Sequence, residues 1–258
     1  MRLMKRILSA AAVLALSASL LVGCSSGTAS SVPVSASSAA ESTVSSVEET
    51  ASSAVDENEA AAAQLLNDLT GSYQELWPVI LADEYKQTWL DDCTALVGED
   101  NAEAAFEKLS SMVTGDVYGE DAVKAYANGG GAHFCGFTNS LATLTFDGET
   151  STISGTDKDG NVLFSHTYHY IGMEPVHGLY EFESDDADSG EFTYFFLAPD
   201  TSAETYHIEF RYGSDADALS QYDAGEYAYW VASGISTDCD QTMIDNCIEL
   251  FCTENLAG

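Results

Sequence analysis

The sequence is poor in basic residues. It contains 8 Lys and Arg against 42 Asp and Glu, which gives a formal net charge of −34 at pH 7. A chain of this charge is repelled by nucleic acid phosphates and by anionic lipid headgroups, so we expect no nucleic acid as a partner. Cations are attracted, although solubility alone is a sufficient reason for such a charge.

Common enzyme motifs are also missing from the sequence. It has no G-x-S-x-G, no H-E-x-x-H and no phosphate-binding glycine loop. The glycines Gly129 to Gly131 precede a strand-like segment, so they lack the helix N-terminus that would hold an anion. The turn Asp157-Lys-Asp-Gly160 lacks the downstream Glu of a calcium loop. We therefore expect that the protein is not an enzyme.

No C-x-x-C motif occurs, which argues against a thiolate zinc site. Besides Cys24 the cysteines are Cys93, Cys135, Cys239, Cys247 and Cys252. An odd number cannot pair completely. Cys247 and Cys252 lie five residues apart on a predicted helix, about 140° around its axis, so they cannot bridge each other. We expect buried free thiols.

The N-terminus resembles a lipoprotein signal peptide. A basic start is followed by an apolar run from Ile7 to Val22, and Leu21-Val-Gly-Cys24 has the lipobox pattern. The alternative is an ordinary secretory signal with a chance Cys. We expect residues 1–23 to be removed and Cys24 to carry fatty acyl chains such as palmitate. The protein would then be lipid-anchored at the extracytoplasmic face of a bacterial cell membrane.

Residues 24–56 are rich in Ser and Ala and nearly free of aromatic residues. Such a segment cannot bury enough apolar surface to fold, so it predicts a disordered tether that is dispensable for stability. Residues 57–258 are long enough for one domain.

Within this domain the pattern predicts an α+β fold, with helices over residues 57–128, a β-barrel over 132–212 and closing helices over 214–256. The predicted helices cover residues 57–69, 73–97, 101–113, 120–127, 215–222 and 240–256. The predicted strands cover residues 132–138, 141–146, 150–155, 162–171, 179–184, 192–197 and 205–212. Asp147-Gly148, Asp159-Gly160 and Ser189-Gly190 are hairpin turns. Consecutive hairpins at this spacing favour an up-and-down antiparallel barrel.

The strand over residues 205–212 has two different faces. Tyr206, Ile208, Phe210 and Tyr212 alternate with Thr205, His207, Glu209 and Arg211. His207 and Glu209 can reach one metal ion or small ligand, and we expect this polar face to point into the barrel. The other interpretation is a half-buried strand with a hydrated polar face.

Several blocks resemble the ZinT family, in consistent order from about Leu69 to Ile235. They are Tyr73-Gln-Glu-Leu-Trp-Pro-Val-Ile80, His166-Thr-Tyr-His-Tyr-Ile-Gly-Met173, Leu179-Tyr-Glu-Phe182, Leu197-Ala-Pro199, Tyr206-His-Ile208, Gly213-Ser-Asp215 and Tyr227-Ala-Tyr-Trp230. The resemblance implies a lipocalin-like (calycin) barrel that binds zinc. It also implies one His before the Leu197-Ala-Pro199 corner and an H-x-H after it as zinc ligands.

The chain departs from that ligand pattern. The first position corresponds to Phe195, which cannot ligate. The H-x-H aligns either with Thr205 and His207 or with His207 and Glu209, and zinc accepts imidazole and carboxylate alike. Water or His133, His166 or His169 would complete the coordination. We expect zinc binding weaker than that of a three-His site, and weaker still as the pH falls below about 6.5.

Of the other histidines, His166 and His169 are three apart on a strand and should face opposite sides. One of them could point into the barrel beside His207. His133 shares a face with Cys135, and His177 lies in a loop.

The sequence therefore predicts a surface lipoprotein that binds a divalent metal ion, zinc first, for possible delivery to a metal ABC importer. The alternatives are a calycin-like module that has lost the metal site and binds a small organic ligand near Arg211, or a surface interaction domain.

Overall fold

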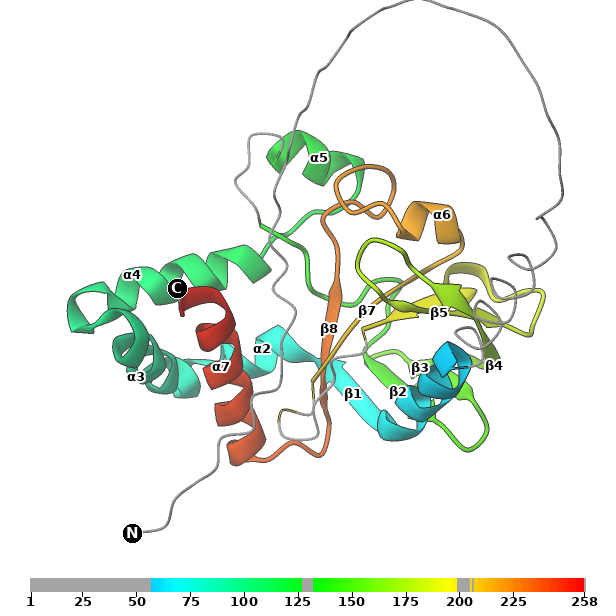
Figure 1. Ribbon diagram of the computed structural model, residues 1–258, viewed down its shortest axis with the longest axis horizontal. Coiled ribbons are helices and arrows are strands. Elements are labelled where there is room, and N and C mark those ends of the chain that lie inside the picture. Colours follow the sequence, from blue (N-terminus) through cyan, green and yellow to red (C-terminus); the bar gives the residue numbers. More distant parts are fainter. Residues whose placement is uncertain (1–56, 127–131, 199–204, 206, 258) are drawn as a thin grey trace, which may run out of the picture. The chain divides into compact units, whose positions relative to one another are not determined.

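The computed structural model describes residues 57–126, 132–198, 205 and 207–257. Its eight strands follow chain order around a closed antiparallel barrel, with β8 paired back onto β1 (Figure 1). The strands are β1 Gly71–Glu75, β2 Thr143–Asp147, β3 Thr152–Thr156, β4 Val162–Met173, β5 Tyr180–Ser184, β6 Tyr194–Leu197, β7 His207–Gly213 and β8 Ala232–Ser236. This is an α+β fold with a lipocalin-like up-and-down barrel, and it confirms the predicted fold class.

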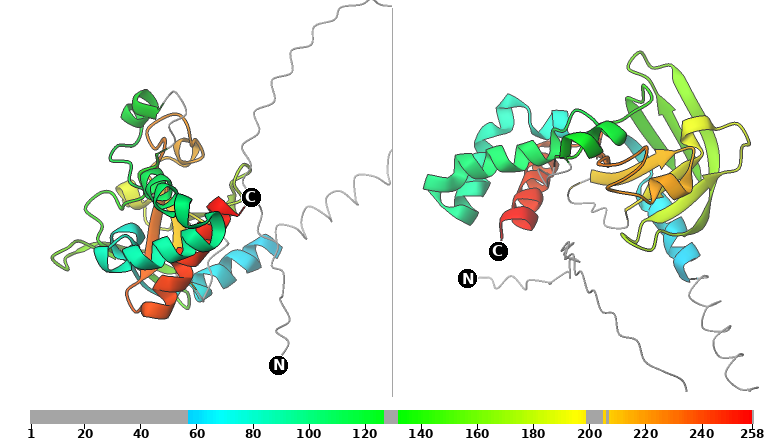
Figure 2. Two further views of the ribbon diagram at one scale, coloured as in Figure 1. Left: turned by 90° about the vertical axis from the view of Figure 1, so that its left-hand side faces the viewer. Right: turned by 90° about the horizontal axis from the view of Figure 1, so that it is seen from above.

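Helices precede β2 and follow β7. They are a helix over residues 57–68, α2 Leu76–Ile80, α3 Lys86–Val97, α4 Glu99–Val113, α5 Glu120–Tyr126, α6 Ala216–Leu219 and α7 Gln241–Leu256. Short 3-10 helices lie at Asp83–Tyr85, between α2 and α3, and at Gly190–Phe192, between β5 and β6. Helices α3, α4 and α7 share one apolar cluster and lie beside the barrel (Figure 2). The expected helices at α4, α5 and α7 are confirmed. Helix α7 begins where predicted, because the Asp240 carboxylate accepts a hydrogen bond from the Met243 N–H at 3.0 Å.

Two strands that close the barrel were not predicted. The expected helix over residues 73–97 starts with β1, and the expected closing helices over 214–256 contain β8. All five residues of β8 are buried, since Ala232 faces the barrel core and Ile235 faces the helical cluster. A strand covered on both sides loses the alternation that identifies a half-buried strand.

The expected strand over residues 132–138 is wrong, because this segment makes only isolated bridges. Phe134 pairs with Thr114 and with Trp230. Beyond it, the backbone N–H of Phe137 donates to the Glu75 carboxylate at 2.6 Å. The Phe137 ring enters the barrel cluster and meets Phe210 at 5.4 Å between ring centroids. The apolar residues of this segment thus alternate because it crosses over the barrel and packs against it. The segment is not a strand of the sheet.

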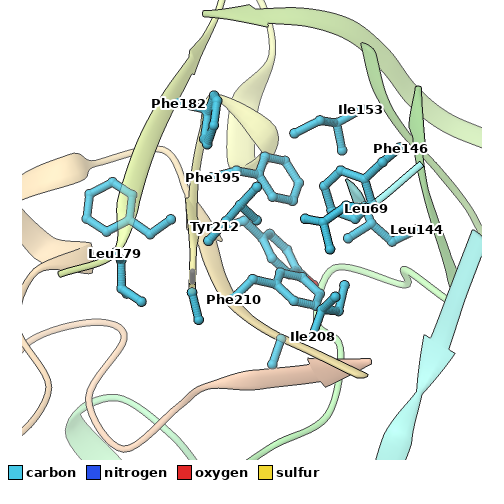
Figure 3. Close-up of a cluster of buried hydrophobic side chains, with 14 of the residues drawn as sticks. Leu69, Leu144, Phe146, Ile153, Leu179, Phe182, Phe195, Ile208, Phe210 and Tyr212 are labelled. Atoms are coloured by element: carbon cyan, nitrogen blue, oxygen red, sulfur yellow. The ribbon is translucent and has the colours of Figure 1, made fainter. Parts of the chain in front are cut away.

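The barrel interior is filled by side chains. Leu144, Phe146, Ile153, Phe182, Phe195, Ile208, Phe210 and Tyr212 are at most 2% exposed and belong to one cluster (Figure 3). The helix over residues 57–68 adds Ala62, Leu65 and Leu66 to this cluster. Each such large apolar side chain contributes about 1.5–3 kcal/mol by burial. The barrel therefore encloses a packed core rather than a ligand cavity.

Residues 1–56 lie outside the described residues, and with them the signal peptide, the Cys24 lipidation site and the tether. Among the helices of the described ranges, none combines the length and the hydropathy of a membrane span.

Candidate metal site

Strand β7 places its apolar face inside the barrel and its polar face outside. Ile208, Phe210 and Tyr212 join the interior cluster (Figure 3). His207 is paired with Ile235 of β8, which faces the helical cluster. The expectation that His207 points into the barrel is therefore wrong. The interior of a small barrel must be filled with side chains, and the apolar face of β7 contributes to this filling. The polar face of β7 therefore points outward, toward α2 and α7.

A recess of about 70 Å³ lies on this outer side of β7. Its lining residues come from α2, β7 and α7: Leu76, Trp77, His207, Glu209, Cys247, Leu250, Phe251 and Glu254. One imidazole, two carboxylates and one thiol thus line a single small space. The volume matches one or two water molecules or a partly hydrated ion, and it is far below the roughly 300 Å³ of a typical organic ligand site.

The imidazole of His207 is held by a neighbour on its own chain segment. Its Nδ1 lies 2.7 Å from Oγ1 of Thr205, and Thr205 is buried. A hydrogen bond at one ring nitrogen fixes the ring orientation and the tautomer, as it does for histidines that bind metals through the other nitrogen.

Two thiols lie within the electrostatic influence of Glu209. Burial, reinforced by the negative charge of Glu209, raises the pKa of Cys135 to about 12 and that of Cys247 to about 12. Both sulfurs are therefore protonated at neutral pH. A metal would have to displace a tightly held proton to use either of them, which makes them poor ligands.

Phe195 occupies the position of the first ligand that the resemblance implies. Its side chain is fully buried and packs on Tyr168 and Tyr212, both at 5.4 Å between ring centroids. This position faces the barrel interior, whereas His207 faces outward, so the two do not meet.

The other candidate histidines lie elsewhere on the fold. On β4, which is separated from β7 by β5 and β6, His166 and His169 face opposite sides as expected. His166 Nδ1 is 2.7 Å from the Asp186 carboxylate, and His169 Nδ1 is 2.7 Å from that of Asp185. His166 is on the inward face with Phe164 and Tyr168, so it does not lie beside the outward-facing His207.

His133 is placed apart from the recess, near the ring of Tyr229. Its Nδ1 is buried without a hydrogen-bond partner, and burial lowers its pKa. It is therefore a neutral, packed histidine. Cys135, which follows His133 by two residues, is influenced by the charge of Glu209, one of the residues that line the recess.

Arg211, the third polar residue of β7, stabilises the fold through hydrogen bonds to the backbone of other segments. Its side chain is fully buried and donates to the carbonyl oxygens of Leu219, Gln221 and Tyr227. The guanidinium carbon lies 4.4 Å from the centre of the Tyr222 ring. Its Nη1 and Nη2 groups are therefore bonded within the fold, so Arg211 does not offer them to an organic ligand as the second sequence-based hypothesis required.

The described residues do not provide the closed zinc site that the resemblance implies. Within those ranges, no three His, Cys, Asp or Glu side chains converge on one point in a way that could hold a metal ion. The first implied ligand position carries Phe195, and the H-x-H positions carry Thr205 and His207 in one alignment or His207 and Glu209 in the other. The structure retains His207 with Glu209 as a pair and adds Glu254 to the lining of the same recess.

Sequence reasoning missed the contribution of α7 to this recess. Cys247 and Glu254 lie seven residues apart, which places them on the same face of the helix. That spacing was visible in the sequence. The packing of this face against β7 was not, because it joins segments about forty residues apart through the tertiary fold.

Solved structures that are similar to this chain include two from Streptococcus pneumoniae. The zinc(II)-bound ZinT-like domain of Streptococcus pneumoniae AdcA has 14% sequence identity and a TM-score of 0.44, over 70% of this chain and 87% of that domain. Zinc(II)-bound AdcA from the same organism has 13% identity and a TM-score of 0.42, over 71% of this chain. The chain spans about a third of that protein, with 34% of it covered.

No family model and no curated protein matches the chain. The identities and TM-scores of the two neighbours are too low to assign family membership or a ligand.

Proposed function

We propose that the protein is an exported, lipid-anchored binding protein, not an enzyme, that takes up a divalent cation at the recess between β7 and α7. Zinc is the first candidate. The observation that carries the proposal is that His207, Glu209 and Glu254 line one recess of ion size. The acidic chain supports it, because a strongly negative surface concentrates cations near the protein.

In this proposal His207 and Glu209 ligate the ion and water completes its coordination. Thr205 holds the ring of His207 in place. An open shell with two protein donors binds less tightly than a closed site with three or four, and it exchanges its ion faster. Such a site suits a carrier that passes a metal to an import system, with the ion as cargo.

The test is calorimetric titration of zinc into the chelator-treated full chain. We expect one ion to bind per chain, and His207→Ala and Glu209→Gln each to reduce the affinity by about tenfold or more. The matched control is His169→Ala, because His169 is half exposed, pairs with Asp185 and lies on β4. This control should bind like the unmodified chain.

A second function is favoured by Phe195, which replaces an implied zinc ligand: a barrel that has lost its metal site and acts as a surface interaction domain. Absence of stoichiometric binding in the unmodified chain would overturn the cation proposal and favour this one. Unchanged binding in His207→Ala would show that the ion binds outside the recess, which overturns the assignment of His207.

A further inference from the structure

Two cysteines from distant parts of the chain touch each other in the helical cluster. Cys93 lies on α3 and Cys252 on α7, 159 residues apart, and their Sγ atoms are separated by 3.9 Å. Both side chains are fully buried. Both belong to the described cysteines, which are free thiols.

The position of Cys252 near the end of α7 allows the two sulfur atoms to form a bond. A disulfide requires a sulfur–sulfur distance of about 2.0 Å, so the atoms must approach by about 2 Å. Cys252 lies four residues before the end of α7 at Leu256. Helix ends fray more readily than helix interiors, so the end of α7 can supply that approach.

We propose that Cys93 and Cys252 form a disulfide bond when the chain meets a small organic disulfide, so that α3 and α7 become covalently joined. One thiolate attacks the organic disulfide, forms a mixed disulfide and releases one small thiol. The second thiolate then attacks the protein sulfur of that mixed disulfide and releases the second small thiol. Two protein thiols are oxidised and one organic disulfide is reduced to two thiols, which take up the two protons.

The bond forms during folding or through opening of the last turn of α7. In the closed helical cluster, burial raises the pKa of both thiols, so the reactive thiolates are scarce there. Once formed, the bond closes a loop that contains strands β2 to β8. A loop of this length restricts the unfolded chain strongly, so the disulfide should raise the melting temperature by about 5–15 °C.

The test compares two refolding reactions of the full chain, one with a glutathione redox pair and one with a phosphine reductant. After free thiols are alkylated, peptide mapping by mass spectrometry should find a Cys93–Cys252 cross-linked peptide only in the glutathione sample. That sample should melt higher, and reductant should abolish the difference. Cys239→Ala is the matched control, since Cys239 is the least buried of these cysteines, and it should keep both the cross-link and the shift.

Cys93→Ala and Cys252→Ala should each lose the reductant-dependent shift in melting temperature. If either variant fails to fold, the peptide map of the unmodified chain decides alone. Absence of the Cys93–Cys252 peptide in the glutathione sample overturns the proposal. The proposal is also wrong if the predominant disulfide joins other cysteines. It is wrong as well if glutathione forms mixed disulfides at Cys239 alone.

Discussion

Arg211 is a buried cation whose neighbours are mainly backbone carbonyl groups. Burial lowers its pKa, but nearby Tyr222 and Glu174 offset part of this change, and the guanidinium group stays charged at neutral pH because its ordinary pKa is very high. The carbonyl groups that accept its hydrogen bonds belong to Leu219 at the end of α6 and to Gln221 and Tyr227 in the segment that follows. A single side chain thus ties this segment to the outer face of β7.

We expect Arg211→Met to destabilise the protein by about 2–4 kcal/mol, because the loop carbonyls lose charged donors while they remain largely buried. Chemical denaturation followed by circular dichroism measures the change. The control is Lys86→Met, since Lys86 pairs with Glu103 at 3.8 Å and both side chains are more than half exposed. This exposed pair should contribute less than about 1 kcal/mol. Similar losses in the two variants would show that Arg211 does not hold the loop.

At the scale of elements, the helix over residues 57–68 is attached to the barrel through the β2–β3 turn. The N–H of Gly148 donates to Thr70 Oγ1 at 3.0 Å. A Cβ atom at Gly148 would lie 2.4 Å from Cα of Asn67 and 2.6 Å from the carbonyl oxygen of Leu66. Only glycine lets the turn and the helix approach this closely.

Gly148→Ala should therefore force the helix and the turn apart and lower the free energy of unfolding by about 1–3 kcal/mol. Gly172→Ala is the control, because a Cβ there meets only the Glu181 carboxylate at an ordinary 3.6 Å. It should be close to neutral in the same denaturation experiment. Equal stability of the two variants would mean that the helix does not pack against the turn in solution.

At the scale of the whole molecule, the sequence predicts that the protein is attached to the cell membrane through acyl chains on Cys24. Cys24 lies outside the described residues, and the proposal rests on the lipobox pattern that precedes it. Acyl chains on Cys24 would supply the membrane affinity that an acidic protein surface does not offer.

Cys24→Ser should therefore move the protein from the membrane fraction to the soluble fraction of the producing bacterium. The measurement is fractionation of the cells with immunoblotting, and Cys239→Ala serves as the control that stays with the membrane. If Cys24→Ser stays in the membrane fraction as firmly as the unmodified chain, the lipobox interpretation is wrong.

Alternation and turn chemistry were enough to predict β2 to β7 and the hairpin turns at Asp147-Gly148 and Asp159-Gly160. Cap and stop signals predicted α4, α5 and α7. These features depend on neighbours within one or two turns or one hairpin, so they can be read from a single sequence. The candidate pair His207 and Glu209 was visible for the same reason, because residues two apart on a strand share a face.

Tertiary structure decided the rest. Strand β8 was hidden because both of its faces are covered, and β1 because it is short and runs directly into α2. Alternation shows that β7 has two faces, but not which one enters the barrel. Because the interior of a small barrel must be filled, the side chains of Ile208, Phe210 and Tyr212 point inward. His207 and Glu209 therefore face α7 instead of the barrel interior.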